Sequence, residues 1–91
     1  MITRRIFVSG RVQGVFFRDW TVSAAVARGI TGWVRNRHDG RVEVLATGEP
    51  ARVDQLVVHL RKGSPSSHVD EVVVEDAEPE RFNGFTRHST V

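Results

Sequence analysis

The sequence contains no cysteine and no tyrosine, and Lys62 is the only lysine among its thirteen Lys and Arg residues. The absence of cysteine excludes a disulfide scaffold, a thiolate nucleophile and a thiolate metal site, so packing alone must hold the fold. A reducing compartment suits such a chain, and we expect it in the cytoplasm. Because few side chains titrate between neutral and strongly basic pH, the pI of about 10.4 accompanies a net charge of only +2 and does not indicate a nucleic-acid binder.

Several motifs that would indicate other functions are also missing. No apolar run approaches the roughly 20 residues that span a bilayer, and the first residues lack the continuous apolar core of a signal peptide. The four histidines show neither H-x-x-x-H nor H-E-x-x-H spacing, and no G-x-S-x-G motif surrounds the serines. We therefore expect no membrane contact, no metal site and no cofactor.

Charge is distributed unevenly along the 91 residues. Residues 1–41 carry eight arginines against two aspartates, whereas residues 42–91 carry five basic residues against nine acidic ones. A local excess of positive charge attracts anionic ligands. The first half of the chain is therefore the half in which we look for an anion site.

The hydrophobic periodicity and turn residues predict seven elements. They predict strands at about 6–10, 30–37, 41–47, 69–75 and 82–88, the last one short, and helices at about 18–28 and 50–62. Gly29 is expected to cap the first helix in a left-handed conformation, and Asp39-Gly40 favours a tight hairpin turn. This order predicts one domain over residues 1–91, an α+β ferredoxin-like βαββαβ sandwich with two helices on one face of an antiparallel sheet.

The segment from Gly10 to Arg18, GRVQGVFFR, carries an apolar strand into a glycine-bearing turn that opens a helix. Such a loop directs backbone N–H groups to one point, beside the positive end of a helix dipole and an arginine. That combination is typical of a site for a small dianion such as phosphate. A tight turn with a solvated arginine would give the same local pattern, and the Lys and Ser/Thr of a nucleotide-binding P-loop are absent.

Asn36 is the second candidate functional residue. It lies three residues before Asp39-Gly40, inside a predicted strand. Asparagine near a hairpin is often a turn residue, but within a strand its β-propensity is low. Its position therefore favours a functional explanation.

The segment from Gly10 to Arg18 and the segment around Asn36 resemble two signatures of the acylphosphatases, small enzymes that hydrolyse the carboxyl–phosphate bond of acyl phosphates. Residues 10–18 resemble the phosphate-loop signature, and residues 29–36 followed by 39–44, GITGWVRN and DGRVEV, resemble the second signature. The resemblance covers nearly the whole chain and implies the fold predicted above. It also implies a small-molecule acyl phosphate as substrate and inorganic phosphate as a product. Nothing in the sequence demands more than a monomer, and we expect no nucleic-acid or membrane partner.

The resemblance also implies roles for individual residues. Arg18 would grip the phosphoryl oxygens and Asn36 would position the attacking water. The loop whose amides line the site would comprise Gln13, Gly14, Val15, Phe16, Phe17 and Arg18. Two positions depart from the family pattern: Arg37 follows Asn36 where many members have threonine, and the polar run Thr86 to Ser89 follows Gly84-Phe85 where members continue with an apolar residue. The polar run predicts that the sheet edge ends early.

A non-catalytic ferredoxin-like module that binds a phosphorylated ligand or RNA is the alternative, because fold alone does not determine function. RNA-recognition modules stack bases on aromatic residues of the third strand. The corresponding residues 41–47 contain no aromatic side chain.

Overall fold

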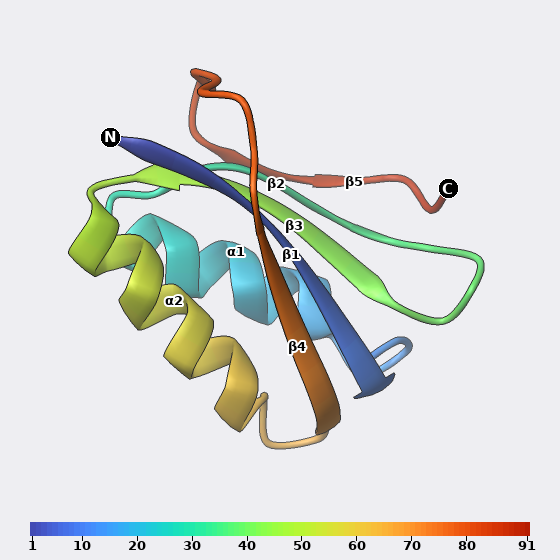
Figure 1. Cartoon of the computed structure of the whole chain (residues 1–91). Coiled ribbons are helices and arrows are strands. Elements are labelled where there is room, and N and C mark those ends of the chain that lie inside the picture. The colour runs from blue at the N-terminus through green and yellow to red at the C-terminus, as the bar shows by residue number, and fades with distance from the viewer.

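The architecture is a five-stranded sheet with two helices covering one face, as the computed structural model of residues 1–91 shows (Figure 1). The elements are β1 (Ile2–Arg11), α1 (Phe17–Ala27), β2 (Thr31–Asn36), β3 (Val42–Gly48), α2 (Pro50–Lys62), β4 (His68–Asp76) and β5 (Phe85–His88). This arrangement confirms the predicted ferredoxin-like α+β fold. Neither helix has the length and apolar composition needed to cross a membrane.

The strands lie in the order β4-β1-β3-β2-β5, and every neighbouring pair is antiparallel except β2 and β5. The segment after β4 passes across one end of the sheet, where the N–H of Ala77 donates to the carbonyl of Thr3 and Thr47 donates to the carbonyl of Glu80 (Figure 1). Because β5 must then start at this end, it runs away from it in the same direction as β2. The sheet is therefore mixed at one edge, which refines the expected antiparallel arrangement.

Strand β1 is longer than its apolar residues predicted. It begins at Ile2, and Thr3, Arg4 and Arg5 pair with β3 on one side, while Arg4 and Arg5 also pair with β4 on the other. The polar side chains of this segment hide the strand in a hydrophobicity pattern. The extent of a central strand depends on its pairing with the strands on both sides, and the hydrophobic periodicity of its own sequence does not reveal that pairing.

The core lies between the sheet and the two helices. Its fully buried members include Ile6, Val44, Leu56 and Leu60, which come from β1, β3 and α2. Helix α1 joins this core and ends as predicted, with Gly29 at φ 67°. The N–H groups of Gly29 and Ile30 donate to the carbonyls of Val26 and Ala25, which is the Schellman pattern of a helix C-terminus.

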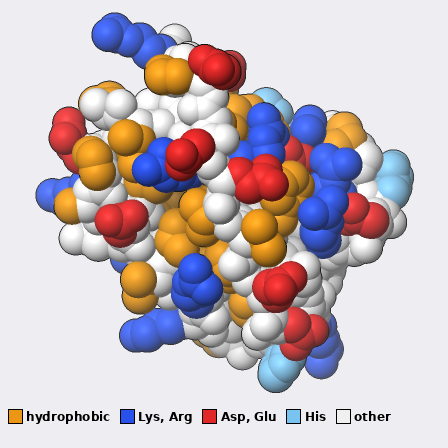
Figure 2. All heavy atoms as spheres, viewed as in Figure 1, with side chains coloured by type: hydrophobic (Ala, Val, Ile, Leu, Met, Phe, Trp, Pro, Cys, Tyr) orange, Lys and Arg blue, Asp and Glu red, His pale blue; other side chains and the backbone are white.

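The opposite face of the sheet is open and holds a buried carboxylate, Glu43 of β3, which is 1% exposed. Arg35 Nε and Arg37 Nη1 donate to Glu43 Oε1 at 2.9 and 2.8 Å, and Arg5 donates to Glu43 Oε2. Burial alone would raise the pKa of Glu43, but the hydrogen bonds from Arg35, Arg37 and Arg5 outweigh it and lower this pKa from its ordinary value of 4.5. On the face seen in Figure 2, Lys and Arg side chains gather toward the end of the β2–β3 hairpin.

We predict that Glu43→Gln lowers the unfolding free energy by about 2–4 kcal/mol at pH 7, because it leaves three arginines around a neutral group. Because the pKa of Glu43 is lower in the folded than in the unfolded protein, the ionised carboxylate stabilises the fold fully above pH 4.5. This stabilisation is lost as the pH falls through the folded-state pKa. The gap between the native protein and the variant should therefore shrink below pH 4.5.

Urea unfolding at a series of pH values measures this gap. Glu78→Gln, at an exposed position after β4, is the matched control and should stay within about 0.5 kcal/mol of the native protein. A gap for Glu43→Gln that does not vary with pH would contradict the electrostatic explanation.

Candidate active site

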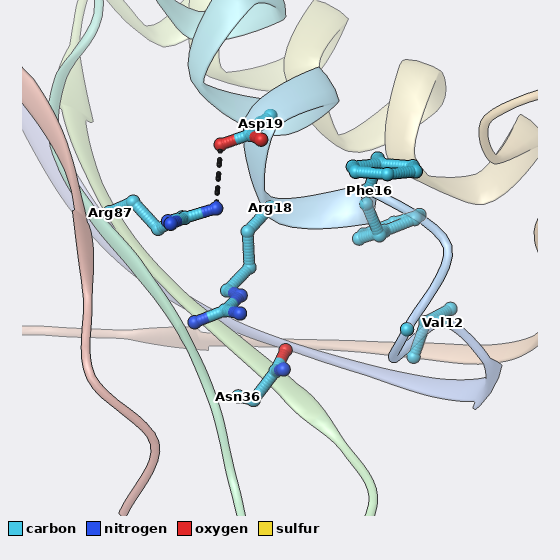
Figure 3. Close-up of a pocket in the computed structure, with 8 residues that line it drawn as sticks. Val12, Phe16, Arg18, Asp19, Asn36 and Arg87 are labelled. Carbon is cyan, nitrogen blue, oxygen red and sulfur yellow. Dashed lines mark hydrogen bonds and ion pairs between the residues drawn. The ribbon is translucent and has the colours of Figure 1, made fainter.

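A cavity of about 190 Å³ lies where the start of α1 meets the ends of β2 and β5 (Figure 3). Its lining brings together residues that are far apart in the sequence. They are Val12, Gly14, Phe16, Phe17, Arg18, Asp19, Asn36 and Arg87. The two predicted catalytic residues, Arg18 and Asn36, therefore share one cavity.

The loop between β1 and α1 is shaped by two left-handed residues. Gly14 has φ 71°, and Phe16, at φ 60°, is the one residue other than glycine with a positive φ. This conformation is unfavourable for an aromatic residue and is found where function or tight packing requires it. It separates two neighbouring rings, because Phe17 is 1% exposed in the core whereas Phe16 is 82% exposed at the rim of the cavity.

The backbone N–H groups of this loop are available to a ligand. None of the N–H groups from Gln13 to Asp19 donates to a backbone carbonyl, and Phe16, the N-cap of α1, provides no side-chain cap. The first N–H groups of a helix have no partner within the helix and carry its positive partial charge. The loop and the start of α1 therefore form a group of donors suited to an anion.

Gln13 and Val15 were predicted among the phosphate-binding residues, but neither lines the cavity. The side chain of Gln13 points to the β2–β3 hairpin, where Nε2 donates to the carbonyls of Arg37 and Arg41 at 2.7 and 2.9 Å. Val15 packs against the core. The other four predicted loop residues, Gly14, Phe16, Phe17 and Arg18, do line the cavity.

Asn36 is the last residue of β2, and its neighbours explain its orientation. Successive side chains of a strand point to opposite faces, and Arg35 and Arg37 both point to Glu43 on the open face. Asn36 consequently faces the cavity, where it is 9% exposed and its Oδ1 has no hydrogen-bond partner. A buried acceptor without a partner costs about 1–3 kcal/mol, and such groups are rare unless they have a function.

Arg18 extends from the first turn of α1 into the same space as Asn36. Figure 3 shows the two side chains pointing toward each other from α1 and β2. Arg18 Nη1 donates to the carbonyl of His88 at 3.3 Å. A guanidinium has five N–H donors, so this single bond leaves most of them available to a ligand in the cavity.

Sequence reasoning did not identify Asp19 and Arg87 as site residues. Both line the cavity, and Arg87 Nη1 lies 3.0 Å from Asp19 Oδ1. The spacing from Phe85 could have identified Arg87, since residues two apart on a strand share a face. No three His, Asp or Glu side chains lie close enough together to hold a metal ion.

Comparison with known proteins identifies close relatives of the chain. A sequence profile of the acylphosphatase family matches residues 4–87. The acylphosphatase of Rhizorhabdus wittichii is 51% identical over 99% of this chain and 91% of its own length, and that of Koribacter versatilis is 59% identical over 86% and 71%. The crystal structure of acylphosphatase from Bacillus subtilis superposes with a TM-score of 0.93 at 40% identity, covering 97% of this chain and 99% of that one.

We predict that Gln13→Ala weakens the binding of inorganic phosphate about tenfold, because the loop loses the two bonds that join it to the hairpin beside Asn36. Each lost hydrogen bond also costs about 1 kcal/mol of stability. Isothermal titration with phosphate and thermal unfolding measure the two effects. Gln55→Ala, at an exposed position of α2, should change neither, and unaltered phosphate affinity in Gln13→Ala would refute the role of this bridge.

Proposed function

The chain belongs to the acylphosphatase family and is an enzyme of that activity, and we propose that Arg18 and the loop amides hold the phosphoryl group while Asn36 positions the attacking water. The observation that supports this proposal most directly is the buried Oδ1 of Asn36, which lacks a partner in the cavity that Arg18 also lines. The substrate would be a small acyl phosphate, and the products a carboxylate and inorganic phosphate.

The chemistry of an acyl phosphate explains why so few groups suffice. The substrate is a mixed anhydride whose leaving group is a carboxylate with a pKa of about 4, so it departs at neutral pH without a proton donor. The remaining requirements are to stabilise the charge of the phosphoryl oxygens and to align the water. Positioning and electrostatics account for most catalysis of phosphoryl transfer.

Phosphoryl binding is assigned to Arg18 and the unpaired N–H groups of the loop and of the first turn of α1. The planar guanidinium can donate to two phosphoryl oxygens at once. The amides add fixed dipoles that need no reorganisation during the reaction. Together they would stabilise the negative charge that otherwise repels the attacking oxygen.

Asn36 can orient water without titrating. Its Oδ1 accepts a hydrogen bond from the water, and its NH₂ group can donate. The water oxygen forms the new bond to phosphorus, the bond between phosphorus and the acyl oxygen breaks, and the carboxylate leaves with the electron pair. One proton of the attacking water stays on its oxygen, which becomes a hydroxyl of the phosphate, and the other passes to a phosphoryl oxygen, so that the products are the carboxylate and dihydrogen phosphate.

The alternative of an RNA-binding sheet finds little support. The aromatic rings of the open face, Phe7 and Trp33, lie under the guanidinium groups of Arg41 and Arg35 at 4.3 and 4.4 Å. His88 also stacks on Trp33. These rings are therefore already covered by side chains of the same chain. All residues that line the cavity also come from one chain, which supports a monomeric enzyme.

We predict that the protein cleaves benzoyl phosphate and leaves an alkyl phosphomonoester such as propyl phosphate intact, since the alkoxide would need a proton donor to depart. Steady-state release of phosphate measures both reactions. Inorganic phosphate should inhibit competitively because it occupies the same amides and Arg18. Equal rates on the two compounds, or no cleavage of the anhydride, would overturn the proposal.

Variants of Arg18 and Asn36 should separate binding from turnover. Arg18→Ala should lose both phosphate affinity and turnover, because the guanidinium contacts the phosphoryl group directly. Asn36→Ala should retain phosphate affinity and lose turnover by more than about 10²-fold, the scale of one lost transition-state contact. Calorimetry with phosphate and kcat on benzoyl phosphate give the two readouts.

The controls are Arg52→Ala and Asn83→Ala, which remove the same side chains from exposed positions outside the cavity. Both variants should match the native protein in phosphate affinity and in kcat on benzoyl phosphate. Turnover retained in Asn36→Ala would remove its assigned role, and phosphate affinity retained in Arg18→Ala would remove that of the arginine.

A further inference from the structure

The ion pair between Arg87 and Asp19 forms a second charged wall of the cavity, opposite the loop. We propose that Arg87, held by Asp19, is a subsite for an anionic group on the acyl part of the substrate. This assignment rests on the proposed function, since it places the phosphoryl group against the loop and Arg18.

The position of Arg87 follows from the pairing of β5. Arg87 pairs with Val34 of β2, and Phe85 with Gly32, so the two residues stand on the same face. Phe85 is buried in the core on that face. Arg87 therefore projects toward the helix layer, where it meets Asp19 of α1 at the edge of the cavity (Figure 3).

The ion pair leaves Arg87 able to bind a ligand. Its side chain is 50% exposed, and the single contact of 3.0 Å to Asp19 engages one nitrogen. The other donors of the guanidinium have no partner in the protein. Asp19 thus fixes the direction of Arg87 while the remaining donors stay accessible from the cavity.

The cavity is large enough for more than a phosphoryl group. Its volume of about 190 Å³ corresponds to roughly six water molecules at about 30 Å³ each, whereas a phosphoryl group has one phosphorus and three oxygens outside the anhydride bond. Figure 3 shows Phe16 and Val12 on one side of Arg18 and Arg87 on the other. A group that reaches Arg87 from a phosphate held by the loop must therefore belong to the acyl part.

Arg87 also neutralises the charge of Asp19. This effect must be distinguished from direct attraction between Arg87 and an anionic group of the substrate. An unpaired carboxylate at the rim of an anion cavity would repel substrate. Removing Arg87 alone would both abolish its contact with the ligand and expose Asp19. The test therefore needs a variant that removes both charges.

The test compares 4-carboxybenzoyl phosphate with 4-methylbenzoyl phosphate, which are similar in shape and differ in charge. The preference is the ratio of their kcat/KM values. Arg87→Met should lower it about tenfold relative to the native protein, on the scale of one charge-assisted hydrogen bond. Asp19→Asn/Arg87→Met should keep a loss of at least about threefold, because the direct contact is absent in this variant too.

Arg4→Met is the matched control, since Arg4 forms a 3.0 Å ion pair with Asp76 outside the cavity. Its preference should equal that of the native protein, and Arg87→Lys should recover part of the loss by restoring the charge. Full recovery in the double variant would show that Arg87 only neutralises Asp19, and an equal loss on both substrates would place it at the phosphoryl group. Either result overturns the proposal.

Equilibrium binding separates this proposal from the proposed function. The probes are 4-carboxybenzylphosphonate and 4-methylbenzylphosphonate, which have no anhydride bond to cleave. If the protein hydrolysed neither acyl phosphate, the catalytic assignment would fail, while a preference for the carboxylated phosphonate that Arg87→Met abolishes would still support the subsite. Equal affinity of the native protein for the two phosphonates would refute the subsite even if hydrolysis is found.

Discussion

The two hydrogen bonds from Gln13 to the β2–β3 hairpin are the contact on which the site depends. Gln13 belongs to the loop that precedes α1, and its Nε2 donates to the carbonyls of Arg37 and Arg41, which flank the turn of the hairpin just beyond the ends of β2 and β3. These bonds join the loop to the hairpin next to Asn36, the residue before Arg37. Catalysis by positioning is sensitive to displacements of about 1 Å, so in the proposed mechanism these two bonds would help to set the geometry of the reaction.

Glu43 explains why Asn36 faces the cavity although it costs stability there. Because side chains alternate along a strand, β2 could present either of its two faces to the helices. The observed orientation places Arg35 and Arg37 beside the buried carboxylate. The opposite orientation would bury two arginines against the helices and leave Glu43 without these partners, at a cost of several kcal/mol. This exceeds the about 1–3 kcal/mol for an unpaired Asn36 Oδ1. The ion pairs of Glu43 with Arg35 and Arg37 on one face therefore stabilise the orientation in which Asn36 faces the cavity on the other.

Local patterns predicted most of the fold, because the residues that determine it are neighbours in sequence. Gly29 ends α1 and the periodicity of residues 50–62 matches α2. The start of β1 and the parallel pairing of β5 could not be predicted, since both depend on strands far away in the chain. In the site, Arg18 and Asn36 were predicted from motifs and do share a cavity. The spacing from Phe85 gives the face on which Arg87 lies, but its contact with Asp19 depends on the pairing of β5 with β2, which no local pattern reports. The side-chain contacts of Gln13 likewise span 24 and 28 residues.

The start of α1 must meet two opposing electrostatic demands. A carboxylate in the first turn, here Asp19, stabilises a helix by interacting with its dipole, but the same carboxylate opposes an anion bound at the amides of that turn. Pairing Asp19 with Arg87 reconciles these demands, because the helix keeps its acidic residue while the cavity keeps an excess of positive charge from Arg18. Strand β5 therefore contributes more than an edge to the sheet. It supplies the cation through Arg87 and the carbonyl of His88 that contacts Arg18, which ties the last strand of the fold to the charge of the site.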